Sequence, residues 1–288
     1  RANATAARLA ALGVKKGDRV VISGHNHPDW PVAFFGVVRA GATAVPIDPA
    51  LEPVQLANVV RESEARVVLW DAKVEEACRA EVEKLGKELV TRPLGDFTTA
   101  DPSLTRPAVE VEDDDVASLI YTSGTTGKPK GVMLTHANFT SLASALAPLF
   151  PLGSGDRVLS VLPIHHTFEF TCGMVLPFSR GARVVYLDEL KGDRVSTALK
   201  EARVTAMVGV PAVWQLLERR ILSQVQAKGP IVEKAFELAA DLNRQLSKGT
   251  GIDLGKVLFG PVHEGLGGNI RWLISGGAAL PPETQKLF

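Results

Sequence analysis

The feature that most constrains the fold is an alternation of short β-branched runs with longer amphipathic segments. The run Val-Val-Leu-Trp at 67–70 has no polar position, which is typical of a strand covered by helices on both faces of a parallel sheet. The pattern predicts strands at 19–23, 43–47, 66–70, 117–122, 157–162, 183–187, 205–210 and 270–274. Helices are predicted at 2–12, 29–40, 53–63, 73–85, 136–150, 194–202, 212–225 and 231–246. This order of elements indicates an α/β protein with doubly wound, mostly parallel sheets and flanking helices.

The two halves of the chain repeat the same turn-to-strand signals in the same order. The repeated strings are GDRV at 17–20 and 155–158, GA at 41–42 and 181–182, and EARV at 64–67 and 201–204. Convergent turn chemistry is the alternative explanation, but the nearly constant offset favours two similar halves. We therefore expect two side-by-side α/β subdomains, 1–115 and 116–288, with a ligand cleft between them. Residues 91–115, which contain three prolines and an acidic run, are predicted to be the linker.

Composition excludes several classes of function. Lys plus Arg and Asp plus Glu each number 32, so the chain has no electrostatic footprint for nucleic acid or an acidic membrane surface. The two cysteines, Cys78 and Cys172, make neither a disulfide framework nor a metal-ligand spacing. Apolar runs stop well short of the roughly 20 residues that a membrane span needs. We therefore expect a soluble, cytoplasmic protein.

Residues 121–131, which read YTSGTTGKPKG, carry recognisable chemistry. Their glycines let backbone amides converge, their hydroxyls donate hydrogen bonds and their lysines add charge, which together suit a polyphosphate. The segment is not a Walker A loop, which needs four residues between its glycines and then Lys-Ser or Lys-Thr. A flexible surface hairpin is the alternative, which the order of residues disfavours. No GxGxxG or GxSxG string occurs, which argues against a Rossmann oxidoreductase and an α/β-hydrolase.

The motif at 121–131 resembles the phosphate loop of the adenylate-forming, or AMP-binding, superfamily, which includes acyl-CoA synthetases, luciferases and peptide-synthetase adenylation domains. Other matching strings are NHPDW at 26–30, the run at 40–51, LPIHHTFE at 162–169, VPAVW at 210–214 and SGGAAL at 275–280. The long stretch between the last two strings is similar to that of long-chain fatty acid–CoA ligases. In peptide-synthetase domains the same stretch is shorter.

By this resemblance, a carboxylate attacks the α-phosphate of Mg²⁺-bound ATP, and the thiol of coenzyme A or an acyl carrier protein then displaces AMP from the acyl-adenylate. The resemblance implies catalytic roles for Lys130 and His166, and a contact of Thr122 with Mg²⁺. His165 is interpreted as structural. The implied phosphate contacts are Thr122, Ser123, Gly124, Thr125, Thr126 and Gly127, and the implied adenine contacts are Gly277, Ala278 and Ala279. Phe168, Phe170 and Trp214 are candidates for lining an acyl tunnel, although aromatic residues on an apolar face are more often plain core.

The resemblance also implies that these residues are the N-terminal part of a longer enzyme. The family's Tyr-Gly-x-Thr-Glu segment, its ribose-binding Asp and its small C-terminal domain with a catalytic Lys have no counterpart in the sequence. We therefore expect residues 1–288 alone to be inactive. Two alternatives stay open, a non-catalytic module that binds nucleotide or acyl groups and an adenylating enzyme for a non-fatty carboxylate.

Overall fold

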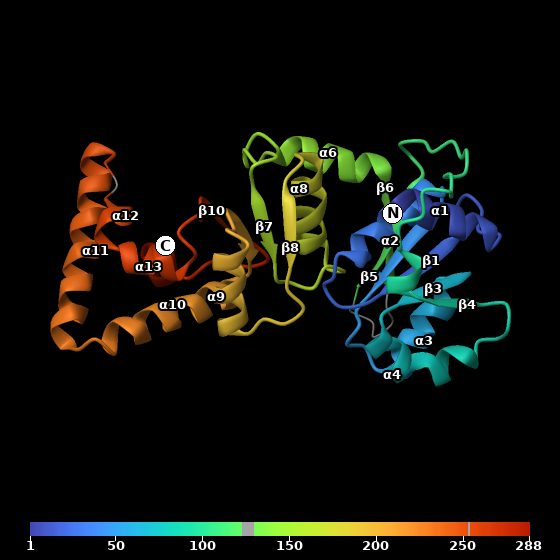
Figure 1. The fold of residues 1–288 in the computed structure, drawn as a ribbon, viewed down its shortest axis with the longest axis horizontal. Coiled ribbons are helices and arrows are strands. Elements are labelled where there is room, and N and C mark those ends of the chain that lie inside the picture. The colour runs from blue at the N-terminus through green and yellow to red at the C-terminus, as the bar shows by residue number, and fades with distance from the viewer. Residues whose placement is uncertain (123–129, 253) are drawn as a thin grey trace. The chain divides into compact units, whose positions relative to one another are not determined.

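The computed structural model describes residues 1–122, 130–252 and 254–288 (Figure 1). It divides the chain into two compact units. The first consists of Arg1–Pro151 and Pro163–Thr171, and the second of Leu152–Leu162 and Cys172–Phe288. Each unit is built on a mostly parallel sheet with flanking helices, so the predicted α/β class is confirmed.

The first unit is built on a sheet whose described strands follow the order β4-β3-β1-β2-β5-β6. All neighbours are parallel except β5 and β6, which are antiparallel. The strands are β1 (Arg19–Ser23), β2 (Thr43–Ile47), β3 (Val67–Trp70), β4 (Val90–Pro93), β5 (Val116–Thr122) and β6 (Lys130–Thr135). The helices are α1 (Ala2–Ala11), α2 (Asp29–Arg39), α3 (Pro53–Glu62), α4 (Ala72–Glu83), α5 (Leu94–Phe97), α6 (His136–Leu146) and α7 (Thr167–Glu169). Strands β1 and β3 are buried along almost their whole length, as the apolar runs predict.

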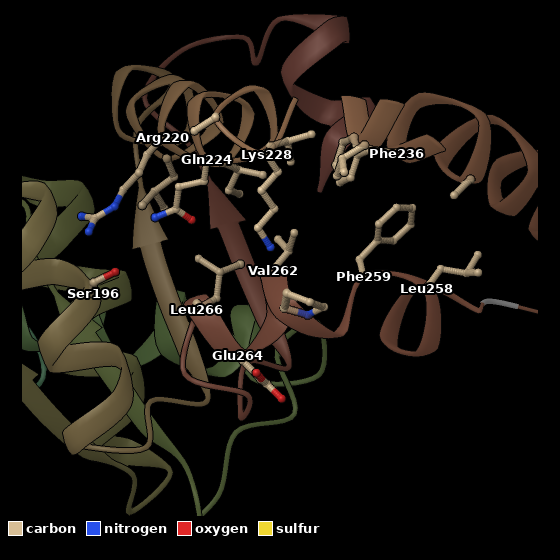
Figure 2. Close-up of a pocket in the computed structure, with 18 of the residues that line it drawn as sticks. Ser196, Arg220, Gln224, Lys228, Phe236, Leu258, Phe259, Val262, Glu264 and Leu266 are labelled. Carbon is tan, nitrogen blue, oxygen red and sulfur yellow. The ribbon is translucent and has the colours of Figure 1, made fainter. Parts of the chain in front are cut away.

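The second unit contains a parallel sheet with the order β10-β9-β7-β8. Its strands are β7 (Arg157–Ser160), β8 (Arg183–Tyr186), β9 (Ala206–Gly209) and β10 (Trp272–Ser275). A π-helical segment, η1 (Phe170–Val175), follows α7. The remaining helices are α8 (Leu176–Ser179), α9 (Gly192–Glu201), α10 (Pro211–Gln226), α11 (Pro230–Thr250), α12 (Gly255–Leu258), α13 (Gly260–Gly265) and α14 (Pro282–Leu287). Helices α10 and α11 meet at Gly229 as the two arms of an open V (Figure 1), and a groove lies between them and α13 (Figure 2).

The internal repeat has a structural counterpart. The orders β3-β1-β2 and β9-β7-β8 correspond, and in both units a glycine with positive φ, Gly41 (+73°) or Gly181 (+70°), precedes the second strand. Non-glycine residues with positive φ also match, since Glu64 (+50°) and Arg203 (+49°) each end a helix-to-strand turn. The two EARV strings therefore lie two residues out of structural register, although the turns that they mark are equivalent.

The first unit extends past the boundary that was expected between residues 115 and 116. Strand β5 pairs in parallel with β2, so β5 and β6 extend the first sheet instead of opening the second. The segment predicted to be a linker contributes β4 and α5 to the first unit. The sequence did not predict these short elements because prolines and acidic residues at 91–115 are typical of a linker. Strand β4 is partly exposed at the sheet edge and ends in Pro93, so it lacks the apolar run of a buried strand.

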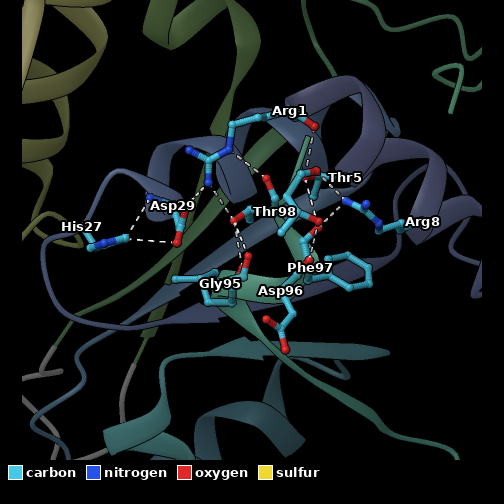
Figure 3. Close-up of polar contacts among 11 residues, drawn as sticks. Arg1, Thr5, Arg8, His27, Asp29, Gly95, Asp96, Phe97 and Thr98 are labelled. Atoms are coloured by element: carbon cyan, nitrogen blue, oxygen red, sulfur yellow. Dashed lines mark hydrogen bonds and ion pairs between the residues drawn. The ribbon is translucent and has the colours of Figure 1, made fainter. Parts of the chain in front are cut away.

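Polar contacts hold the N-terminal helix α1 of the first unit in place (Figure 3). The Arg1 guanidinium forms an ion pair with Asp29 at the start of α2, and its Nε donates to the Thr98 carbonyl at 2.9 Å. The Arg8 guanidinium donates to the carbonyls of Phe97 and Thr99 at 3.0 and 2.8 Å. These bonds satisfy carbonyls at and just after the end of the short helix α5, where partners within the helix are missing. They join α1, α2 and α5 on one side of the sheet.

Candidate functional site

The motif predicted to bind phosphate joins β5 to β6. The two strands pair up to Thr122 and Lys130, which are register partners, and the Thr122 hydroxyl lies 3.5 Å from the Lys130 carbonyl oxygen. The predicted phosphate ligands Ser123, Gly124, Thr125, Thr126 and Gly127 lie outside the described residues. The strand pair therefore holds both ends of the predicted loop at one point of the first sheet.

The two described ends of the loop expose the chemistry that a polyphosphate needs. Thr122 and Lys130 are both exposed, and among the described residues the Lys130 ammonium has no ion-pair partner. Behind Lys130 the chain is tightly packed, because a Cβ on Gly131 would lie 2.8 Å from Leu119 Cδ1. An exposed hydroxyl and an exposed ammonium at the ends of a strand pair fit phosphate oxygens, and the hydroxyl fits a hard cation such as Mg²⁺.

A second cluster surrounds the two adjacent histidines of the string at 162–169. His166 is exposed, whereas His165 is buried with its Nε2 3.7 Å from Asp48 Oδ2. The two imidazole rings lie 4.4 Å apart between centroids. Burial lowers the pKa of His165 to about 4, against the opposing effect of the Asp48 carboxylate. His165 is therefore neutral at neutral pH, and His166 is the histidine of this pair that faces solvent.

The strings NHPDW and LPIHHTFE, far apart in sequence, are in contact. The Ile164 amide donates to Asn26 Oδ1 at 3.0 Å. Phe170, directly after the second string, packs edge-on against Trp30 and Phe34, with ring centroids 6.1 and 4.7 Å apart. Asn26 and the Trp30–Phe34 pair thus hold the segment that presents His166. Asn26 and Asp48 were not among the predicted site residues, although both lie in the matching strings at 26–30 and 40–51.

The three predicted acyl-chain residues occupy different environments. Phe170 is fully buried among the aromatic rings of the first unit, and Phe168 is half-buried. Trp214 is buried in the second unit, where a Cβ on Gly209 would lie 2.7 Å from its Cζ2. Trp214 also borders a hollow of about 840 Å³ that is lined in part by Trp272, Leu280 and Phe288. The acyl-binding role of Phe168, Phe170 and Trp214 stays a prediction.

The predicted adenine-binding residues follow β10 at the carboxyl end of its strand. Gly277, Ala278 and Ala279 are exposed, and Gly277 has a φ of +77°. A Cβ on Gly277 would lie 3.3 Å from Val210 Cγ1, so the strings SGGAAL and VPAVW are neighbours. Carboxyl ends of parallel strands are where α/β sheets bind ligands, and small residues there leave room for a planar base.

The predicted site residues thus form two groups, one in each unit. Thr122, Lys130, His166, Phe168 and Phe170 belong to the first unit, and Trp214 with 277–279 belongs to the second. Within the described ranges, no three His, Cys, Asp or Glu side chains form a metal-binding group. None of the helices in these ranges combines the length and apolarity needed to cross a bilayer.

Comparison with known proteins gives matches along the whole chain. A family model described as AMP-binding enzyme matches residues 1–288. The long-chain-fatty-acid–CoA ligase FadD13 of Mycobacterium tuberculosis is 33% identical over 225 residues, which cover 76% of this chain and 44% of that protein. A feruloyl-CoA synthase of an Amycolatopsis species is 32% identical over 209 residues, which cover 73% of this chain and 42% of that protein. The chain therefore spans less than half the length of these two relatives.

A solved structure shares the fold. The inhibitor-bound N-terminal domain of FACL13 from Mycobacterium tuberculosis matches with a TM-score of 0.75 and 28% sequence identity. The match covers 99% of this chain and 63% of that chain. Both units of the chain therefore have counterparts in a domain of this kind.

Proposed function

The chain belongs to the AMP-binding enzyme family, and from that premise we propose that it carries the nucleotide-binding part of an ATP-dependent ligase that joins a fatty carboxylate to coenzyme A. The observation that carries the proposal is the pairing of Thr122 with Lys130 at the two ends of the YTSGTTGKPKG motif. This pairing presents an exposed hydroxyl and an exposed ammonium where the family resemblance expects phosphate.

The proposed reaction has two steps. A carboxylate oxygen attacks the α-phosphorus of ATP, and the bond to the bridging oxygen breaks to release pyrophosphate. The sulfur of coenzyme A then attacks the acyl carbon, and AMP leaves with the electron pair of the broken carbon–oxygen bond. Both steps need stabilisation of negative charge on phosphate oxygens more than proton transfer. Mg²⁺, when bound, would supply part of that stabilisation, with Thr122 as the candidate ligand.

Each described residue has a role in this scheme that its position supports. Lys130 would stabilise the charge of the phosphates, since its ammonium is exposed and lacks an ion-pair partner in the described ranges. His166 would contact the carboxylate or the α-phosphate, because it is the exposed member of the histidine pair. The residues at 277–279 would form one wall for adenine. The hollow beside Trp214 would accept the first part of the acyl chain.

The fatty carboxylate is favoured by the apolar side chains of Trp272, Leu280 and Phe288 in the hollow beside Trp214, and by the similarity to FadD13. The similarity to a feruloyl-CoA synthase makes an aromatic carboxylate the competing substrate class. The acceptor thiol is proposed to be coenzyme A, with an acyl carrier protein as the alternative.

The test is ATP–pyrophosphate exchange with the gene product that carries this chain, using acetate, octanoate, palmitate, ferulate and an amino acid. Because each buried methylene contributes roughly 0.8 kcal/mol, we expect the apparent KM for the acid to fall steeply from acetate to palmitate. Formation of the thioester with added coenzyme A would be followed by mass spectrometry. Equal exchange with acetate and palmitate, or a preference for ferulate, would contradict the fatty-acyl assignment. Exchange with none of the acids would indicate a binding module.

A further inference from the structure

The amino edge of the second sheet carries three neighbouring arginines. Arg157 is the first residue of β7, and its register partner Arg183 is the first residue of β8. On the other side of β7, Arg203 lies in the turn before β9, and the amide of Thr205 in that turn donates to the Arg157 carbonyl at 2.9 Å. Arg157, Arg183 and Arg203 are called the arginine row below. Neighbouring strands lie roughly 4.8 Å apart, so the row spans about 10 Å. It lies at the end of the sheet opposite to the predicted adenine contacts at 277–279.

The arginine row has no internal partner for its charge. Within the part of the chain that the structure describes, none of its three guanidinium groups forms a hydrogen bond or an ion pair. The outer two arginines are exposed and the middle one is half-buried. Of the two carboxylates nearest in sequence, Asp156 is buried, accepts from Thr205 Oγ1 at 2.7 Å and pairs with Arg271 at 3.1 Å. The other, Glu201, is exposed and forms no ion pair in the described ranges. The row therefore keeps its positive charge available to a ligand.

The equivalent edge of the first sheet shows that the fold does not require this charge. By strand order and turn geometry, Arg19 is the counterpart of Arg157. Glu64 is likewise the counterpart of Arg203, with φ values of +50° and +49°. In the first sheet the Arg19 guanidinium pairs with the Glu64 carboxylate at 2.7 Å. The second sheet has a second arginine in place of that carboxylate, so an ion pair is replaced by two like charges.

The third member of the row adds to this repulsion. Arg157 and Arg183 are register partners on parallel strands, so their side chains lie on the same face of the sheet. The first sheet has the neutral Thr43 at the position of Arg183. Like charges on neighbouring strands destabilise a sheet. A local cost of this kind without an internal compensation is typical of a functional surface, and the ligand that removes the cost is an anion.

The residue type and the spacing of the arginine row favour carboxylates on a helix. An arginine guanidinium binds a carboxylate through two parallel hydrogen bonds, which a lysine ammonium does not. Successive turns of a helix are about 5.4 Å apart, close to the roughly 4.8 Å between strands. Acidic side chains one turn apart would therefore meet successive arginines. A bilayer attracts lysine and arginine alike through a diffuse field, and the zero net charge of the chain disfavours a nucleic acid.

We propose that the arginine row is a docking surface for an acidic helix of a partner protein, with carboxylates from successive turns on Arg203, Arg157 and Arg183. The helix would lie across the starts of β9, β7 and β8, in the order in which these strands stand in the sheet. Docking there requires neither ATP nor a carboxylate substrate. The proposal therefore does not depend on the proposed ligase function.

The probe is a fluorescein-labelled helical peptide of alanine and glutamine that carries three glutamates four residues apart. Its binding to the 288-residue protein would be measured by fluorescence anisotropy. The control peptide has the same composition, with its three glutamates in succession. We expect the spaced peptide to bind about tenfold more tightly, because only its carboxylates reach all three arginines. Its affinity should fall as salt is raised, since the contacts are exposed ion pairs.

The most informative variant is Arg203→Glu, which introduces the carboxylate that the first sheet has at this turn. It gives Arg157 an ion-pair partner, so the variant should resist urea at least as well as wild type. Its affinity for the spaced peptide should nevertheless fall by about tenfold or more. Arg219→Glu makes the same charge change at an exposed position of α10 outside the row, and should bind like wild type. Lysine at all three row positions keeps the charge but should weaken binding, because the paired hydrogen bonds are lost.

Several outcomes would overturn the proposal. Equal affinity for the two peptides, or wild-type affinity in the triple lysine variant, would show attraction by charge alone. Wild-type affinity in Arg203→Glu would place the binding elsewhere. Tighter binding of phosphatidylserine vesicles or of duplex DNA, lost in Arg203→Glu, would make a membrane or a nucleic acid the ligand. Self-association of the wild type that Arg203→Glu abolishes would make an acidic segment of a second copy the occupant. Pyrophosphate exchange enters none of these measurements, so the ligase proposal is tested separately.

Discussion

The burial of His165 predicts a specific loss of stability in acid. In an unfolded chain a histidine titrates near 6.5, whereas burial lowers the pKa of folded His165 to about 4. Between these values the unfolded state takes up a proton that the folded state does not, so the free energy of unfolding falls as the pH falls. The groups that face His165 are the Asp48 carboxylate, which opposes this shift, and the His166 ring, which adds to it. From the two pKa values, the loss is about 2 kcal/mol between about pH 7.5 and about pH 5.

The perturbation is His165→Gln, which keeps a polar side chain of similar size and removes the titration. Urea unfolding of both proteins would be measured from about pH 7.5 to about pH 5, with hydrogen exchange in β1 and β3 to assign the transition to the first unit. Groups that do not interact with His165 contribute equally in both proteins, so their contributions cancel in the difference. We expect the wild-type chain to lose about 2 kcal/mol more than the variant over this range. Parallel pH profiles for the two proteins would refute the burial argument.

Glycine substitutions at two places, Gly267 with Gly268 as its control and Gly209, test the second unit. Gly267→Ala places a Cβ 2.4 Å from the Leu199 carbonyl oxygen at a φ of +88°, so it should cost about 1–3 kcal/mol more in urea unfolding than Gly268→Ala, which has a φ of +69° and open space. Equal losses would show that the Leu199 contact does not matter. Gly209→Ala would push a methyl group against the Trp214 ring, 2.7 Å from Cζ2, and should flatten the dependence of exchange on acyl length while leaving the KM for ATP unchanged. An unchanged length profile would separate Trp214 from the acyl site.

The buried strands could be predicted from the sequence because both of their faces are covered, which requires continuous apolar runs. Strands β1 and β2 have the predicted bounds, 19–23 and 43–47. The edge strands β4 and β6 were missed. Strand β6 is exposed over its first four residues, and its sequence KGVMLT places three apolar residues in a row after Lys130 and Gly131, so it shows no alternation of apolar and polar positions. Its pairing with β5 depends on tertiary structure, which local composition does not predict.

The sequence predicted the parts of the candidate site whose residues are contiguous in the chain, and it did not predict contacts between distant residues. The residue types of the motif at 121–131 predict phosphate binding without any knowledge of the fold. In contrast, the support of the His166 segment by Asn26 joins residues 138 positions apart, and the approach of Asp48 to His165 is equally remote in sequence. Neither contact has a signal in spacing or periodicity. The sequence supported a structural role for His165, and its burial explains why the neighbouring histidine is the exposed one.

The central claim is that the YTSGTTGKPKG motif binds the phosphates of ATP during adenylate formation, and Lys130 tests it most directly. The measurement is palmitate-dependent ATP–pyrophosphate exchange in the gene product that carries this chain, comparing wild type with Lys130→Ala and with Lys15→Ala, an exposed lysine before β1. We predict a loss of about a hundredfold in Lys130→Ala and a wild-type rate in Lys15→Ala, with both variants folded. Exchange at the wild-type rate in Lys130→Ala would contradict the role given to this motif.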